Sequence, residues 1–465
     1  MSIDLQDYFN LGLESTNNTV DNAGLINVFR TPVDTSSANL NRITFKIPKT
    51  GLITSDSMVT VQFVGEADSG NITPNFINGA IGCIKRTRIL VDNKVLVDLQ
   101  KPGLAENVKL YSRNTQIELA ESQYKLMGNQ FRSTVNSAGE EIFDIKNSRY
   151  YETADPDIYA IDRNIIKGVS DSKVYGIPLK YLGAEFLEAA SLPVFLLGQR
   201  EMVLELTFHS DSGQYACNTF STSVIASNSV KVNLANCELV TTHIQLSDEV
   251  EQQERMNLVN EPVQYPLLDT YVINGVVPGG VVGQASNHTY RLNAQNREVH
   301  NILMVPHNQS GEDDKSMLCA NQRSMSLGNV TLQTRVNGQN VYDRPISNQT
   351  VLYGLTTYSE NNMALKLPIN ACRVDSKTLV NFRQSASKFY LDYRGSMNYL
   401  KQDFTNGNAG VFGSGTLFTT AAEIDYSVVP AVNASPDQTD QRDMLFYVSV
   451  SKLLQIGATT IDISY

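Results

Sequence analysis

The stretch SLPVFLLGQREMVLELTFH, residues 191–209, changes its pattern halfway along. It opens with a Leu-Pro pair and an apolar run. From Met202 to Phe208 every second side chain is apolar, and the positions between carry Val203, Glu205 and Thr207. A period of two predicts a β-strand with one buried face. Such a strand fits an enzyme's sheet, the wall of a binding protein or a structural shell, so the rest of the chain must decide.

The composition limits the functions that the chain can have. Its 465 residues predict two or three domains. With 37 Lys and Arg against 48 Asp and Glu, the net charge is −11 and no segment carries a dense basic run. We therefore expect no direct binding of nucleic acid, because such binding depends on neutralising phosphates.

Neither a membrane span nor a secretory signal is expected. No apolar run approaches the roughly 20 residues of a spanning helix, and the amino terminus lacks a basic segment followed by a long apolar one. Folding in a reducing cytosol or nucleus follows. The cysteines have no Cys-x-x-Cys spacing and are expected to be free and mostly buried. They are Cys83, Cys217, Cys237, Cys319 and Cys372.

Strand-like segments dominate the chain. They are short, rich in Val, Ile, Thr and Tyr, and separated by Gly, Asn, Asp and Ser, which favours a sandwich or barrel. The segments are 41–47, 58–64, 87–99, 202–208, 229–246 and 329–342. Helical patterns are confined to about 104–127, 183–191 and 249–257, which suggests short helices inserted in loops.

An internal repeat suggests a duplicated β-domain. Residues 91–98, VDNKVLVD, align with residues 336–343, VNGQNVYD, at an offset of 245 positions. Asp-Asn and Asn-Gly tolerate the positive φ angles of a two-residue hairpin turn, so each copy predicts a strand, a turn and a strand. In a chain of this length, the offset leaves two halves of similar size.

The segment between the halves, residues 237–273, reads as a bridge. A strand ends at Leu246, and Ser247 and Asp248 can cap a helix with an acidic first turn. Pro262 is expected to terminate this helix before another strand begins.

Three segments carry a resemblance to a known family. Residues 177–208 contain Pro178-Leu179 and Leu192-Pro193 ahead of the alternating strand, with Glu201 directly before it. In this they resemble the double jelly-roll major capsid proteins of tailless icosahedral double-stranded DNA viruses, a lineage that includes adenoviruses, virophages, polinton-like viruses and large algal viruses. The bridge and the closing segment 446–465, with its turn at Gly457, are similar to the same family.

One segment departs from the large algal members, which usually carry an Asn-Phe-Ser-Arg-like stretch late in the second roll. This chain has Asn381-Phe382-Arg383 there. The departure favours smaller relatives, such as virophages or polinton-like viruses.

The resemblance implies an all-β fold of two tandem eight-stranded jelly-roll sandwiches with short helices in loops. The implied divisions are an N-terminal arm (1–24), a first roll (25–248), a connecting helix (249–260) and a second roll (261–465). It also implies a structural, non-enzymatic major capsid protein without catalytic residues, cofactor or metal. Three chains would form a pseudo-hexameric capsomer.

The implied partners are two further copies, neighbouring capsomers, and penton and minor capsid proteins, with no direct contact to nucleic acid. The chain would be synthesised in the host cytoplasm, assembled in the cytoplasm or nucleus, and located in the virion capsid.

Other segments are assigned by composition. Segments 129–176, 306–325 and 394–442 are rich in Asn, Gly, Ser and Asp and are expected to be long loops that build outward towers and subunit contacts. In the arm, Leu5, Tyr8, Phe9 and Leu13 can share a helix face. The arm would dock under a neighbouring capsomer, on an inner protein or on an internal membrane, or remain a disordered tail.

The alternative is a β-rich carbohydrate-binding or carbohydrate-active protein: a lectin, fibre adhesin or glycosidase. A cupin-type metal site needs His-x-His with a following Glu and a later His. The histidines do not have this spacing, and the chain has no tryptophan to stack on sugars. The five histidines are His209, His243, His288, His300 and His307.

Overall fold

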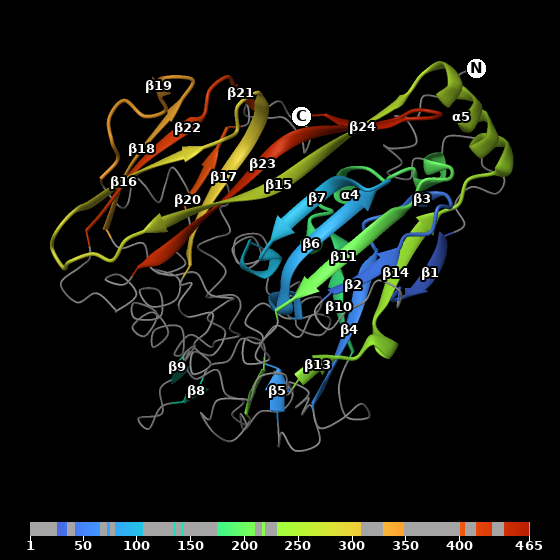
Figure 1. Ribbon diagram of the computed structural model, residues 1–465, viewed down its shortest axis with the longest axis horizontal. Coiled ribbons are helices and arrows are strands. Elements are labelled where there is room, and N and C mark those ends of the chain that lie inside the picture. The colour runs from blue at the N-terminus through green and yellow to red at the C-terminus, as the bar shows by residue number, and fades with distance from the viewer. Residues whose placement is uncertain are drawn as a thin grey trace.

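The computed structural model describes two β-sandwiches that lie side by side (Figure 1). The described residues are 26–34, 42–65, 72–74, 80–105, 134–135, 141–142, 174–209, 216–218, 230–307, 329–347, 400–404, 415–429 and 441–464. In these residues antiparallel strands predominate and helices are few, which confirms the predicted all-β class.

The first sandwich uses strands from the first half of the chain. Its main strands are β1 (Ile26–Pro32), β2 (Arg42–Lys46), β4 (Met58–Gly65), β6 (Ile84–Val91), β7 (Lys94–Gln100), β10 (Val174–Pro178), β11 (Met202–Phe208) and β14 (Glu238–Ile244). One sheet has the order β1-β14-β4-β10 and the other the order β2-β11-β6-β7. The shorter strands β3 (Leu52–Ile53) and β13 (Val230–Val232) pair with β14 and β4.

The second sandwich follows the helix α5 (Asp248–Asn260). Its main strands are β15 (Val263–Val277), β16 (Ser286–Leu292), β17 (Arg297–His307), β18 (Asn329–Val336), β19 (Gln339–Asn340), β20 (Leu400–Asp403), β22 (Ala422–Val429) and β23 (Arg442–Ile456). Its sheets run β15-β23-β17-β20 and β16-β22-β18-β19. The short strands β21 (Thr416–Phe418) and β24 (Ile461–Ser464) pair with β17 and β23.

Both sandwiches have the same topology. When the main strands of each are counted in chain order, one sheet reads first-eighth-third-sixth and the other second-seventh-fourth-fifth. This order, with two antiparallel sheets face to face, is that of a jelly roll. The prediction of two tandem eight-stranded jelly rolls is thus confirmed.

The predicted hairpin repeat forms in both sandwiches. In the first, Asp92 and Asn93 join β6 to β7 with φ angles of 50° and 63°, and in the second, Asn337 and Gly338 join β18 to β19 with φ angles of 53° and 77°. Two successive positive φ angles define the turn that matches the twist of a two-stranded ribbon.

Strand register extends the repeat beyond the hairpins. Thr44 on β2 and Arg88 on β6 lie opposite the same residue of β11. Thr289 on β16 and Gln333 on β18, each 245 positions further along, lie opposite the same residue of β22. The corresponding sheets of the two jelly rolls therefore share one register on both sides of the seventh strand.

Helix α5 begins as the sequence predicts. The Ser247 side chain accepts a hydrogen bond from the Val250 backbone N–H at 3.4 Å, and the first turn is acidic. Leu258 is buried against the first sandwich. The predicted helix at 183–191 is much shorter, because only α4 (Phe186–Ala189) forms there. The 3₁₀-helix η4 (Val194–Leu197) follows it, and its apolar side chains are buried.

Two sequence expectations were wrong. Segment 394–442 is not one long loop, since it contains β20, β21 and β22. Strand β22 alternates Ile424, Tyr426 and Val428 on its buried face with polar residues on the other, a pattern outweighed by the Asn and Gly residues around it. The predicted strand 229–246 is interrupted by the 3₁₀-helix η6 (Leu234–Asn236), where the Asn233 side chain accepts from the Ala235 N–H at 3.2 Å.

The hairpin turns give a testable prediction. Asn93→Val should lower the free energy of unfolding by roughly 1–2 kcal/mol, because a β-branched residue is strained at positive φ. Asn93→Gly, the matched control, should stay within about 0.5 kcal/mol of the original chain. Urea unfolding would measure both. Equal stability of the two variants would contradict the assigned turn.

Candidate functional site

The interface between the two sandwiches has the most elaborate arrangement of buried side chains in the described part of the chain. At its centre Lys452 of β23 forms an ion pair with Asp269 of β15, with 3.1 Å between Nζ and Oδ2. The same Nζ donates to the backbone oxygens of Leu96 and Val95 on β7, at 2.7 and 3.2 Å. All three ammonium protons thus have acceptors, two of them in the other sandwich.

This ion pair is deeply buried. The side chains of Lys452 and Asp269 are 2% and 5% exposed. Burial raises the pKa of the Asp269 carboxyl, and the Lys452 charge opposes that shift. Removing one partner of such a pair leaves an uncompensated charge in the interior. The interface therefore depends on both charges being present.

Aromatic hydroxyls add further links between the sandwiches. Tyr447 Oη donates to the backbone oxygen of Lys101 at 3.2 Å, and Tyr265 Oη donates to the backbone oxygen of Ala190. The Tyr265 ring also meets Phe186 edge to face, with 6.2 Å between centroids. These contacts place two tyrosines of the second sandwich on two separate segments of the first.

The C-terminal β23–β24 hairpin lies against the first sandwich. Arg200 donates to the backbone oxygens of Gly457 and Ala458, both at 3.2 Å. Lys94 donates to the Ile461 backbone oxygen and lies 2.9 Å from the Asp462 carboxylate. The hairpin is thereby held at both its turn and its last strand.

Apolar packing is continuous across this interface. One buried cluster joins the core of the first sandwich to residues of β15, β17, β23 and β24. The second-sandwich members are Tyr265, Leu267, Leu303, Val305, Leu445, Tyr447, Leu454, Ile456 and Ile461. Domains move freely unless the surface between them is large and apolar. The two sandwiches therefore share one continuous apolar core.

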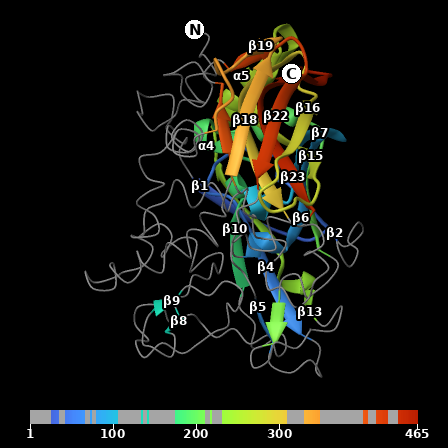
Figure 2. The same cartoon turned by 90° about the vertical axis from the view of Figure 1, so that its left-hand side faces the viewer.

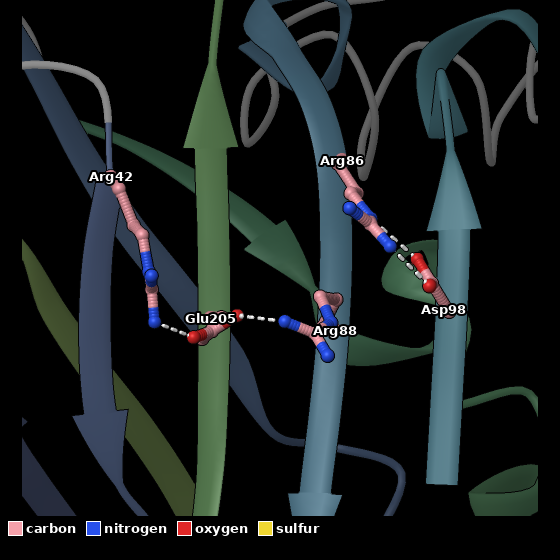
Figure 3. Close-up of polar contacts among 5 residues, drawn as sticks. All are labelled: Arg42, Arg86, Arg88, Asp98 and Glu205. Carbon is pink, nitrogen blue, oxygen red and sulfur yellow. Dashed lines mark hydrogen bonds and ion pairs between the residues drawn. The ribbon is translucent and has the colours of Figure 1, made fainter. Parts of the chain in front are cut away.

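A second polar arrangement lies on the outer face of the sheet β2-β11-β6-β7 (Figure 3). Glu205 points away from the core and accepts hydrogen bonds from Arg42 on one side and Arg88, at 3.1 Å, on the other. Arg86 Nε donates to Asp98 Oδ1 at 2.6 Å, and this hydrogen bond raises the pKa of Arg86. Although it lies on an outer face, the Glu205 side chain is only 6% exposed.

The second sandwich has a related arrangement. Asp425 of β22 accepts from Thr289 at 2.7 Å and from Arg335 at 2.5 Å. The Thr289 hydrogen bond, followed by Arg335, lowers the pKa of the Asp425 carboxyl. Glu205 and Asp425 occupy matching positions on the seventh strands. Each sandwich thus has an outer face of paired charges.

Four histidines lie within the described strands or directly beside them, each on a different sheet. His209 follows β11, His243 lies on β14, His288 on β16 and His300 on β17. The side chain of His307 lies outside the described residues. No group of three or more metal-ligating side chains occurs in the residues that the structure describes.

Three of these histidines are buried. Burial lowers the pKa of His209 to about 3, with the Lys101 and Lys85 charges adding to the shift. Burial also lowers the pKa values of His243 and His300. The His243 Nδ1 donates to the Thr50 backbone oxygen at 2.6 Å, while its Nε2 has no hydrogen-bond partner among the described residues.

Cys83 and Cys237 are buried, and burial raises the pKa of the Cys237 thiol to about 11. They therefore agree with the sequence prediction. The Cys217 side chain, Cys319 and Cys372 lie outside the described residues. No helix of the described residues is long and apolar enough to cross a membrane.

Several predicted segments cannot be placed. The arm (1–24), Asn381-Phe382-Arg383 and most of segments 129–176 and 306–325 lie outside the described residues. The interface itself was not predicted from the sequence. Its visible signal is Lys452 within a largely apolar strand, which marks a buried charge that needs a partner.

Comparison with known proteins gives fold-level matches. No family model and no curated protein matches this chain. Among solved structures, PBCV-1 VP54, fitted into a reconstruction of the virophage Sputnik, aligns with a TM-score of 0.60 and 12% identity over 97% of this chain and 99% of that one.

Two further structures align over most of both chains. The Faustovirus major capsid protein gives a TM-score of 0.55 and 10% identity over 98% of this chain and 94% of its own. A chain of the Sputnik virophage structure gives a TM-score of 0.54 and 9% identity over 97% of this chain and 91% of its own. At these identities the likeness establishes a shared fold, the double jelly roll, over nearly the whole chain.

The buried ion pair gives a prediction. Lys452→Met should lower the free energy of unfolding by about 3–5 kcal/mol, because it leaves Asp269 charged and unpaired. The double variant Lys452→Met with Asp269→Leu should recover most of this loss. The control Lys46→Met breaks an exposed pair with Glu201 and should cost less than about 1 kcal/mol. Denaturant unfolding would measure all three. If Lys452→Met lowered the free energy of unfolding no more than Lys46→Met does, the assigned ion pair would be contradicted.

The buried histidines predict a pH dependence of stability. Because the pKa of His209 is lower in the folded chain, the unfolded chain takes up the proton first. The contribution of His209 to the free energy of unfolding is complete above about pH 6.5. It is lost as the pH falls toward 3, at up to about 1.4 kcal/mol per pH unit. His209→Asn should flatten this decline, measured by urea unfolding between pH 7 and pH 4.5. A variant that declines as steeply as the original chain would refute the assignment.

Proposed function

We propose that this chain is the major capsid protein of a tailless icosahedral double-stranded DNA virus. The observation that carries the proposal is the pair of jelly rolls with one strand order and one register, joined by a shared apolar core and the buried Lys452–Asp269 ion pair. Viral capsid proteins share this fold over nearly their whole length, which supports a structural role in a virion.

The proposed division of the chain has four parts, and the pairing of the described strands supports the boundary between the two jelly rolls. An N-terminal arm (1–24) precedes the first jelly roll (25–248), a connecting helix (249–260) and the second jelly roll (261–465). In the described residues, the strands before α5 pair only with one another, as do those after it. We propose that the arm contacts a neighbouring capsomer, an inner protein or an internal membrane.

The capsomer would be a homotrimer. Each chain has two equivalent jelly rolls, so three copies around a threefold axis give six. Six similar jelly rolls have a nearly hexagonal outline, which can tile a flat facet. A ring of heterologous contacts closes under such symmetry. All three copies can then be identical, although the two jelly rolls of each copy contact different neighbouring chains.

The other proposed properties accompany this role. The chain has no catalytic activity, cofactor or resident metal, and does not bind nucleic acid directly, in keeping with its net charge of −11. Its partners are other capsomers, penton and minor capsid proteins. It is made in the host cytoplasm and assembled there or in the nucleus. A carbohydrate-binding or carbohydrate-active protein is not favoured, because the similar solved structures are capsid proteins.

Native mass tests the proposal. Three chains of 51.4 kDa should give a particle of about 154 kDa. Particles imaged on a grid should have a hexagonal outline with threefold symmetry. A chain that stays monomeric at micromolar concentration, or that cleaves or binds glycans in a defined pocket, would contradict it.

A further inference from the structure

Residues Lys94–Leu96, at the start of β7, are one of the segments of the first jelly roll that contact the second. Lys94 reaches Ile461 and Asp462, and the backbone oxygens of Val95 and Leu96 accept from Lys452. Leu96 is fully buried at this contact. The start of β7, the fifth main strand of the first jelly roll, therefore binds the neighbouring jelly roll.

The second jelly roll has the same surface, but nothing among the described residues covers it. At the offset of 245 positions, the counterparts of Lys94, Val95 and Leu96 are Gln339, Asn340 and Val341. All three are exposed, and Val341 has 43% of its surface accessible where Leu96 has none.

Leu417 extends this exposed surface. It is 56% exposed, and its backbone oxygen accepts from the Asn337 side chain at 2.9 Å, which places it beside the hairpin turn. We call Gln339, Asn340, Val341 and Leu417 the hairpin patch.

A second exposed apolar surface lies on the first jelly roll. Strand β1 is at the end of its sheet and pairs only with β14 in the described part of the chain. Ile26 is 65% exposed and Val28 is 59% exposed, both on one face of the strand. We call these two residues the β1 edge. Free strand edges with large apolar side chains are normally covered by a partner.

The two surfaces lie at opposite ends of the molecule. In Figure 1, β19 is near the left-hand end and β1 is at the right-hand side, with the interface between the rolls in the middle. Figure 2, which faces the left-hand end, shows β18 and β22 in front and β1 behind them. Surfaces at opposite ends cannot meet within one chain, but they can join successive copies head to tail.

We infer that the hairpin patch of one copy packs against the β1 edge of a second copy, repeating between chains the role that the start of β7 has within the chain. Such a contact is heterologous, and it closes a ring of three if a threefold axis relates the copies, as the proposed capsomer requires. This inference rests on the proposed capsid function and assigns the two surfaces that would join its subunits.

Paired cysteines test the contact directly. A chain carrying both Val28→Cys and Val341→Cys should form disulfides between copies under mild oxidation, giving covalent dimers and trimers on a denaturing gel. A disulfide requires Cα atoms within about 7 Å, so the bond reports contact rather than mere proximity. The control pair Val28→Cys with Val174→Cys should give no such ladder.

Charged variants test what the contact contributes. Val341→Asp or Val28→Asp should raise the concentration needed for half-maximal trimer formation at least tenfold, because each buries a carboxylate in an apolar contact. Val174→Asp is the matched control, since Val174 is also 43% exposed but lies on β10. Native mass spectrometry measures the trimer fraction, and circular dichroism confirms that each variant is folded.

The outcomes separate the two proposals. If the original chain forms trimers, but the cysteine pair does not cross-link and the charged variants assemble like the control, the assigned contact is wrong and the capsid proposal stands. If the original chain itself stays monomeric, both are overturned. Cross-linking together with selective loss of trimers supports the contact.

Discussion

Strand β23 has to complete two hydrophobic cores at once. Phe446 and Val448 belong to the core of the second jelly roll, whereas Leu445 and Tyr447 belong to the cluster shared with the first. A strand buried on both faces reads as a nearly continuous apolar run rather than an alternating one. The strand pairs with β15 along fifteen residues, so a long ladder fixes its register. The relative placement of the two jelly rolls depends on this double burial.

Within that apolar run, Lys452 contributes specificity rather than stability alone. A buried ion pair contributes little net free energy compared with apolar residues of the same volume, but a partner missing from it is costly. Lys452 satisfies its three protons only if Asp269, Leu96 and Val95 are all in place. A shift of β23 by one residue would send the ammonium to the opposite face. The pair therefore selects one arrangement of the two rolls among those that apolar packing alone would allow.

The sequence predicted the elements that local chemistry determines. The turn at Asp92-Asn93, the Ser247 cap of α5 and the alternation of β11 all depend on residues within a few positions of one another. The inter-roll interface depends on residues far apart, since Lys452 and its acceptor Leu96 are separated by 356 positions. No local pattern encodes such a pairing. The strand β22 was missed for a different reason, because turn residues around it masked its alternation.

The two jelly rolls keep their register while their side chains have diverged, and the divergence follows the environment. The acid on the seventh strand is retained as Glu205 and Asp425, each paired with arginine on an outer face. At the start of the fifth strand, by contrast, buried Leu96 corresponds to exposed Val341. The two jelly rolls have the same backbone register but different side chains at this surface. The difference is expected, because the surface of the first roll is covered within the chain and that of the second is exposed. Because the exposed copy still carries an apolar residue, its surface is suited to a partner of the same kind as the one that Leu96 contacts.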